Sequence, residues 1–259
     1  MKKKTDLVVK SKKLVEASYR LSLVEQQLIL FTIVQARENQ TGLFPDQPCV
    51  IRVTDFARAF GVDTEKNKGL YDELKNAVNN LYDRSLTFTE SYINDAGRVT
   101  GFKRVTETRW ISEKSYVDGA GLLHMIFAPA VIPEITRLEE RFTTYFLQKM
   151  SKLTSVYAIR LYELMTSFKE IGKREIKLDW LRMHFDLGDS YSKVAELKRN
   201  VIDPSVKQIN KHTDLKISYT QTKTGRNVTG FVFTIRPNVP KAATKKTVSA
   251  DPVVDDVEF

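Results

Sequence analysis

Residues 191–213 read YSKVAELKRNVIDPSVKQINKHT, and residues 215–235 read LKISYTQTKTGRNVTGFVFTI. In the first stretch apolar side chains recur at helical spacing on one face, and lysine, arginine and asparagine occupy the other faces. The second stretch alternates apolar and polar residues on both sides of a turn at Gly225, which predicts a β-hairpin. A basic helix followed by a hairpin is the order of a recognition helix and wing in a winged helix-turn-helix domain.

The residues before this pair complete the arrangement. Residues 153–168 carry apolar side chains at helical spacing, and 175–178 alternate as a short strand. Asp179 stands where it can cap a helix over 180–185, and Gly188 is placed to end that element. The second half of the chain is therefore predicted to run helix, strand, helix, helix, hairpin.

The first half repeats this order with a different sequence. Ser22 and Glu25 have the spacing of a capping box ahead of a helix over 23–34. The other expected elements are a strand over 50–53, a helix over 56–60 capped by Thr54 or Asp55 and ended by Gly61, a helix over 70–82, and strands over 86–89 and 101–110 joined by a turn at 94–97. The Asp and Arg spacing of 55–58 recurs in 179–182.

Two copies with matched breaks favour a specific fold over a generic small α+β domain. We predict an α+β protein of two tandem winged-helix domains, each a helix-turn-helix with a β-hairpin wing. The expected divisions are a basic flexible N-terminal arm over 1–13, a first winged-helix domain over 14–130, a second over 131–239 and a disordered tail over 240–259.

The composition places the chain among ordinary globular proteins. Of its 259 residues 42% are hydrophobic and 28% charged, and no run approaches the 18 apolar residues of a membrane span. The N-terminus lacks the apolar core of a secretory signal peptide, and the single cysteine, Cys49, excludes an internal disulfide framework. We expect a reducing, cytoplasmic location and no membrane partner.

The net charge of +9 and the pI near 9.4 favour a polyanionic partner. Residues 1–130 carry a net charge of +3, residues 131–240 carry +7, and residues 241–259 carry −1. Most of the positive field therefore belongs to the second half, which is the better candidate for the main DNA-reading domain.

The second domain supplies most of the candidate DNA contacts. Arg199 can bind guanine through its planar fork and Asn200 can pair with adenine, whereas lysines more often contact phosphates. The predicted DNA contacts here are Lys193, Lys198, Arg199, Asn200, Lys207, Asn210 and Lys211 on the helix, and Lys223 and Arg226 at the hairpin tip. A solvated helix face is the alternative interpretation of the helical positions.

A proline interrupts the basic helix. Pro204 removes a backbone hydrogen bond from a helix interior, so we expect a bend at 202–204. Asp203 can cap a second helical segment that has Pro204 at its first position.

The first domain is a weaker reader, because its candidate helix over 70–82 carries one basic residue beside two acidic ones. Its predicted DNA contacts are Lys75, Asn79, Arg84, Arg98 and Lys103. The helix over 23–34 is more apolar than one buried face requires. This excess indicates either complete burial or a dimer interface, for which Leu28, Ile29 and Phe31 are the candidates.

Motifs of an enzyme are not found. No G-x-x-x-x-G-K-[ST] loop occurs, and His124, His184 and His212 stand apart, without the His-x-His pair of a metal-dependent nicking enzyme. Cys49 lacks a basic neighbour that would activate its thiol. We expect no enzymatic activity, no cofactor and no metal.

Several of these segments resemble the iteron-binding plasmid replication initiators of the RepA, RepB and RepE type. The resemblance rests on 127–133, 145–147 and 153–164, and on 197–204 with 209–215, and it spans roughly residues 10–237. The family often has another basic residue where this chain has Asn200. Arg160 is interpreted as a structural or inter-domain pairing residue.

The resemblance implies two winged-helix domains that bind direct repeats at a plasmid origin as a monomer. It also implies repression of the protein's own gene as a dimer at an inverted repeat, and recruitment of the host replication initiator and the replicative helicase. A winged-helix transcriptional repressor shares the fold without the initiator role. A rolling-circle initiator is a further alternative, and the missing histidine pair argues against it.

Overall fold

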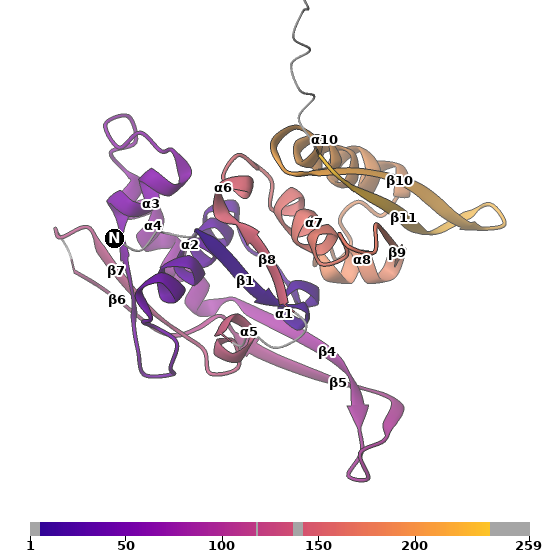
Figure 1. Ribbon diagram of the computed structural model, residues 1–259, viewed down its shortest axis with the longest axis horizontal. Helices are drawn as coiled ribbons and strands as arrows, with labels where there is room; N and C mark the ends of the chain where they lie inside the picture. The colour runs from indigo at the N-terminus through magenta and orange to yellow at the C-terminus, as the bar shows by residue number, and fades with distance from the viewer. Residues whose placement is uncertain (1–5, 118, 137–141, 239–259) are drawn as a thin grey trace, which may run out of the picture.

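The computed structural model describes residues 6–117, 119–136 and 142–238. Its helices and strands form a larger lobe around α2 and α4 and a smaller lobe around α7, α8 and α10, and each lobe extends a β-hairpin (Figure 1). The tail expected over 240–259, and the first five residues of the expected basic arm, lie outside the described residues. No helix in the described ranges is long and apolar enough to cross a membrane.

The first winged helix has the expected elements in the expected order. They are α2 (Leu23–Asn39), β3 (Cys49–Arg52), α3 (Val53–Phe60), α4 (Leu70–Asp83), β4 (Ser85–Ile93) and β5 (Val99–Arg109). The predicted capping box is present, because the Ser22 side chain accepts from the Glu25 amide and the Glu25 carboxylate accepts from the Ser22 amide. The order of the elements in this half is thus confirmed.

The sheets of the first domain are more elaborate than the sequence indicated. Two further strands, β6 (Ile111–Val117) and β7 (Leu122–Phe127), continue from the hairpin, and only the buried Trp110 separates β5 from β6. The strand orders are β3-β7-β6 and β2-β4-β5, with β2 at Ser18–Tyr19. The short strand of this copy therefore pairs with β7 and not with its own hairpin.

The segment expected as a flexible basic arm is part of the fold, and that prediction is wrong from residue 7 onward. Here β1 (Leu7–Ser11) pairs antiparallel with β8 (Phe142–Phe146), and α1 (Lys12–Glu16) follows at once. Val8 and Val9 are fully buried, and so is Lys10, whose Nζ lies 2.7 Å from a Glu163 carboxylate oxygen. The adjacent apolar residues bury this strand, although the number of lysines in the segment had indicated an exposed arm.

The same strand pair extends the first domain beyond the predicted division at residue 130. The short helix α5 (Ile132–Thr136) packs against β1, and Ile132 and Ile135 join the apolar core. Because β8 closes a sheet with the N-terminal strand, residues 132–146 complete the first domain before the chain enters the second.

The second winged helix follows the order α7, β9, α8, basic helix, hairpin. Helix α6 (Leu147–Met150) precedes it and packs on α2, α3 and β8 of the first domain. The elements of the second winged helix are α7 (Val156–Thr166), β9 (Lys173–Lys177), α8 (Leu178–His184), α9 (Val194–Leu197), the π-helical segment η1 (Lys198–Ile202), α10 (Asp203–His212), β10 (Leu215–Thr224) and β11 (Asn227–Pro237). The strand order is β10-β11-β9, so here the short strand pairs with the wing itself.

The predicted N-caps of the two turn helices are wrong. Helix α3 begins directly after β3, with Arg52 at its N-cap, and α8 begins directly after β9, with Lys177 there; neither cap residue makes a side-chain hydrogen bond. Asp55 and Asp179 therefore lie in the first helical turn, where a carboxylate still interacts favourably with the helix dipole. Gly61 ends α3 in the left-handed conformation as expected, whereas α8 ends at His184, ahead of Gly188.

At the position of the predicted bend the helix changes from the π-helical segment η1 to α10, between Ile202 and Asp203. Pro204 has no N–H to donate to the carbonyl four residues earlier. The preceding residues widen into a π-turn in which the Asp203 amide donates to the Lys198 carbonyl. The predicted cap at Asp203 is wrong, because its carboxylate accepts the Tyr219 hydroxyl and Ile202 occupies the N-cap of α10.

The three residues predicted as a dimer interface are core residues of this structure. Leu28 and Ile29 are fully buried and Phe31 is 2% exposed, with its ring edge-on to Phe56 at 5.6 Å. Helix α2 is covered from several sides by β1, β3, α3, α4 and α6. Its excess of apolar residues is explained by complete burial, so the interface assignment to these residues is corrected.

Candidate nucleic-acid interface

The basic helix of the second domain consists of α9, η1 and α10 in succession. Leu197, Val201 and Ile209 are buried, and the segment packs on α7 and β10. The opposite side is solvent-accessible, as a recognition helix requires. The exposed predicted contacts on it are Lys193, Arg199, Asn200, Lys207 and Lys211.

The residues predicted to read bases occupy the π-helical segment. Lys198, Arg199 and Asn200 are its first three residues, and Pro204 follows the segment in the next helix. Lys198 is half-buried, with its Nζ 5.9 Å from the centre of the Tyr219 ring, while Arg199 and Asn200 are exposed. π-turns inside helices are frequent at functional sites, because they displace side chains from regular helical positions. This segment is therefore the strongest candidate for base contacts.

Asn210 has a different role from the one the sequence predicted. Its amide nitrogen donates to the Ile217 carbonyl at 2.8 Å, and its amide oxygen accepts from the Ile217 N–H at 2.6 Å. Both polar atoms of the side chain are thus bound to β10. We correct its role from base reading to fixing α10 against the first strand of the wing.

The wing presents its predicted contacts at the tip. Hairpin β10–β11 projects from the body of the second lobe (Figure 1). Gly225 at the tip has a left-handed φ of 60°, which suits glycine, and Lys223 and Arg226 beside it are exposed. Both side chains are therefore accessible to a phosphate backbone.

Arg182 supports the recognition helix and was not among the predicted site residues. Its guanidinium donates to the carbonyls of Gly188, Ser190 and Tyr191 at 2.7, 2.9 and 2.8 Å. These carbonyls belong to the loop that leads into α9. The repeated Asp and Arg spacing marked this position, but only the structure shows that Arg182 organises the loop.

The candidates of the first domain are less available than those of the second. Lys75 is half-buried, 4.0 Å from the centre of the Tyr116 ring, and Asn79 is half-buried on the same helix. Arg84 binds both carboxylate oxygens of the fully buried Glu25, at 3.2 and 3.3 Å. Releasing it would leave a buried charge unpaired, so its predicted role as a DNA contact is corrected to a structural one.

The remaining two candidates, Arg98 and Lys103, are exposed on the β4–β5 hairpin. Lys103 donates to the Ser91 hydroxyl across the hairpin at 3.1 Å. This hairpin projects from the first lobe, whereas the wing of the second domain projects from the other lobe (Figure 1). The structure therefore does not gather all predicted contacts on one surface.

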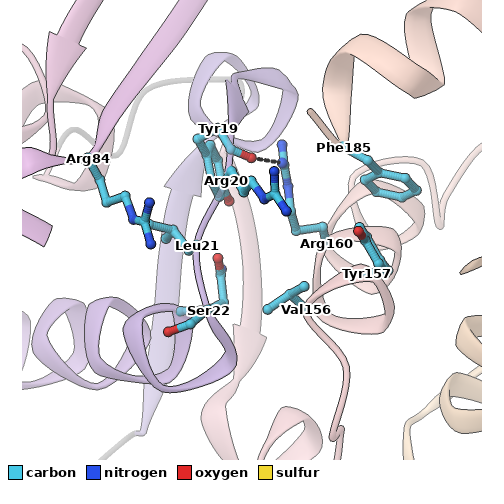
Figure 2. A pocket seen from close by; sticks show the side chains of 10 residues that line it. Tyr19, Arg20, Leu21, Ser22, Arg84, Val156, Tyr157, Arg160 and Phe185 are labelled. Atoms are coloured by element: carbon cyan, nitrogen blue, oxygen red, sulfur yellow. Dashed lines mark hydrogen bonds between the residues drawn. The ribbon is translucent and has the colours of Figure 1, made fainter. Parts of the chain in front are cut away.

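Arg160 joins the two domains, as its interpretation as an inter-domain pairing residue anticipated. From α7 it donates to the carbonyls of Tyr19 at 2.5 Å and Ala17 at 2.6 Å (Figure 2). Its guanidinium carbon lies 3.7 Å from the centre of the Tyr19 ring. Burial lowers the pKa of Arg160, because the charged form loses its hydration.

Around Arg160 other polar contacts cross the same joint. Arg174 of the second domain binds the Glu16 carboxylate at 2.9 Å, and the Ser18 hydroxyl donates to the Met183 carbonyl. His184 is fully buried between these groups, and burial together with the neighbouring Arg160 charge lowers its pKa well below 6.5. The joint is thus polar, buried and specific in geometry.

Two winged helices with a basic, solvent-facing recognition helix define a class of DNA-binding proteins. Comparison with known families agrees in both halves. Residues 7–166 match the family described as "Initiator Replication protein, WH1", and residues 177–235 match "Initiator Rep protein, WH2". The chain belongs to this family of initiator replication proteins, and its two winged-helix domains are confirmed.

Two relatives cover almost the whole chain. An "Uncharacterized 27.6 kDa protein" from Escherichia coli is 28% identical over 237 residues, which are 88% of this chain and 93% of that protein. The crystal structure of Pi initiator protein in complex with iteron DNA superposes with a TM-score of 0.68 at 19% identity, covering 90% of this chain and 98% of that one. At this identity the structural match establishes the shared fold.

Proposed function

We propose that this protein initiates plasmid replication by binding direct repeats, the iterons, at the origin as a monomer. The observation that carries the proposal is the recognition segment of the second domain, with Arg199 and Asn200 exposed on a π-turn; the same domain also carries Lys223 and Arg226 exposed at the tip of its wing. Family membership supports the initiator role. The relative crystallised with iteron DNA supports the choice of DNA target.

The geometry of repeated sites favours the monomer on direct repeats. One chain already contains two winged helices, joined rigidly through Arg160, so a single copy can follow one repeat with two DNA-binding units. Repeats arranged head to tail do not match a two-fold dimer, whose half-sites must be inverted. Successive monomers on successive repeats satisfy this constraint.

Repression of its own gene as a dimer at an inverted repeat is the second part of the proposal. A dimer surface must come from residues other than the buried core of α2. Strand β5 is the outer strand of its sheet, and its exposed apolar residues Val99, Phe102 and Val105 are 65–75% exposed. An unpaired apolar edge of this kind supports pairing with a second copy.

The proposal also includes contacts with the host initiator and the replicative helicase, which the family resemblance implies. We propose no covalent chemistry, cofactor or metal for this chain. The only cysteine, Cys49, is 1% exposed, and burial raises the pKa of its thiol to about 12. A nucleophilic role for this thiol is therefore disfavoured.

Footprinting on the DNA that flanks the gene tests the central claim. We expect protection of tandem direct repeats, with a periodicity of about one or more helical turns of 10–10.5 bp. Transformation by an origin plasmid with and without the gene then separates an initiator from a repressor. Protection of one palindrome alone, with no gene requirement for transformation, would favour the repressor.

A nicking assay on supercoiled plasmid tests the absence of DNA cleavage. We expect no relaxed product with magnesium or manganese present. Site-specific nicking would contradict the proposal and favour a rolling-circle enzyme.

A further inference from the structure

A cavity of about 310 Å³ lies where the two domains meet. The first domain contributes residues 19–22, the first turns of α2, and Arg84 at the end of α4. The second contributes the start of α7 and Phe185. In Figure 2, Arg84 stands on one side of this cleft and Arg160, Tyr157 and Phe185 on the other, with Arg20 between them.

The charge of the cleft is positive. Arg20, Arg84 and Arg160 line it, and among the described residues no aspartate or glutamate does. Arg20 is exposed, and no hydrogen bond or ion pair joins it to another described residue. Arg84 uses its Nε and one terminal nitrogen on Glu25, and the other terminal nitrogen is not engaged by that pair. Three guanidinium groups therefore converge with donor capacity left over.

The cleft is also lined by buried polar atoms that have no partner within the protein. Gln26 on α2 is fully buried, and neither its amide nitrogen nor its amide oxygen is hydrogen-bonded. The Tyr19 hydroxyl and the Arg160 Nε, on two other lining residues, are likewise unpartnered. A buried polar atom without a partner costs about 1–3 kcal/mol; these four have almost no accessible surface, so a polar ligand in the cleft gives them partners only when the lining side chains shift.

We propose that this inter-domain cleft binds a phosphate group. Guanidinium groups bind phosphate oxygens through paired, charge-assisted hydrogen bonds, for which Arg20 and Arg84 retain donors, and the Gln26 amide nitrogen and the Tyr19 hydroxyl add neutral donors after that shift. The phosphate comes either from a small phosphorylated molecule or from a DNA backbone; both present the same oxygens. Because its contacts lie on both domains, bound phosphate stabilises the domain arrangement in which the cleft forms.

Titration of the full chain with inorganic phosphate, and separately with pyrophosphate, tests binding of a free ligand. Sodium chloride keeps the ionic strength constant, and binding is followed by isothermal calorimetry and by the thermal midpoint. We expect a saturable rise in Tm for the native chain and at least tenfold weaker binding for Arg20→Ala. Arg20 is exposed, so this variant folds. Arg236→Ala, which removes an exposed arginine of β11 that does not line the cleft, is the matched control and retains full affinity.

Gln26→Leu supplies an independent variant. It removes two unpartnered buried polar atoms at similar size, so we expect a stable protein with at least tenfold weaker phosphate binding. Equal affinity of the native chain and Arg20→Ala, or equal losses in Arg20→Ala and Arg236→Ala, would overturn the proposal, because binding would then be to the basic surface in general.

Salt-dependent binding to a random-sequence duplex distinguishes the two sources of phosphate. A DNA-backbone phosphate in the cleft predicts that Arg20→Ala lowers the slope of log affinity against log salt by about 0.9. A small phosphorylated ligand predicts saturable binding of the free probes and an unchanged slope. No saturable binding together with an unchanged slope would refute the site.

Discussion

The two winged helices share an order of elements but differ in how they use it. In the first domain, Arg58 binds Asp55 within α3 at 3.0 Å, whereas the equivalent Arg182 binds the loop that leads into the recognition helix. The first domain's α4 is regular, and the second domain's helix contains a π-turn before Pro204. The equivalent arginine thus stays within its own helix in the first copy and holds the approach to the recognition helix in the second.

Arginine shows the same difference in its burial. Arg84 of the first copy pairs with a fully buried glutamate, while Arg199 of the second copy is exposed on the recognition segment. Arg160, between the copies, is buried and bound to backbone carbonyls. The three arginines have the same side chain and charge, so only their surroundings differ. We call Arg199 the candidate reader, Arg84 the brace and Arg160 the joint. The predictions below test that separation, from the largest expected effect to the smallest.

Arg160→Met removes the joint between the two copies. Four buried groups then lose a partner or a stacking contact: two carbonyls, the Tyr19 ring and His184. We expect the free energy of unfolding, measured by urea denaturation, to fall by about 3–5 kcal/mol. Arg20→Met, next to the joint but exposed, is the control and changes stability little. A loss below about 1 kcal/mol would show that the joint does not hold the domains together.

Arg84→Met tests the brace of the first copy. We expect a loss of stability of about 2 kcal/mol, because the fully buried Glu25 keeps its charge without its partner and Arg84 itself is partly solvent-exposed. Folded Arg84→Met should bind random-sequence DNA with a salt slope lower by at most about one phosphate contact. A loss of sequence discrimination in this variant would instead make Arg84 a base contact.

Arg199→Ala tests the reader of the second copy. We expect specific binding to the repeat to weaken by about 1–3 kcal/mol, binding to random DNA to change far less, and stability to stay the same. Competition binding with both DNAs measures the ratio. Equal weakening on both would make Arg199 a phosphate contact.

Low pH is expected to weaken the joint through His184. Its pKa is lowered in the folded chain, so the unfolded chain binds the extra proton more readily and stability falls as the pH drops below about 6.5. The groups that face it are the Arg160 and Arg174 cations and the Glu16 backbone. Between pH 7.5 and 5.5 we expect the free energy of unfolding to fall by about 1.4 kcal/mol, measured by urea denaturation at each pH. His184→Phe should remove this increment; an unchanged pH dependence would exclude His184 as its source.

The two hairpins provide the smallest and most selective test. Replacing Lys223 and Arg226 together by alanine should lower the salt slope of DNA binding by about two contacts of 0.9 each. Replacing Arg98 and Lys103 on the β4–β5 hairpin is the matched change in the first copy. Equal slopes for the two double variants would show that both hairpins lie along the DNA.

Much of the fold was accessible from local patterns. Apolar spacing located α2, α4 and the two hairpins, the Ser22–Glu25 pair marked the start of α2, and Pro204 indicated the change from η1 to α10. These features depend on residues near one another in the chain. Errors came where a distant strand or helix supplied the partner, as for Lys10 with Glu163 and Arg84 with Glu25.

What the sequence determined by itself is the order of the elements, the duplication and the basic second half, because hydrophobic periodicity, helix breaks and charge are local properties. The tertiary structure alone decided which arginine is exposed on the recognition segment, which pairs with a buried glutamate and which connects the two domains. It also placed Leu28 and Ile29 in the core, and it brought Arg20, Gln26 and Arg160 to one cleft. Burial and hydrogen-bond partners depend on segments that meet only after folding, and they determine whether a polar side chain is available to a ligand.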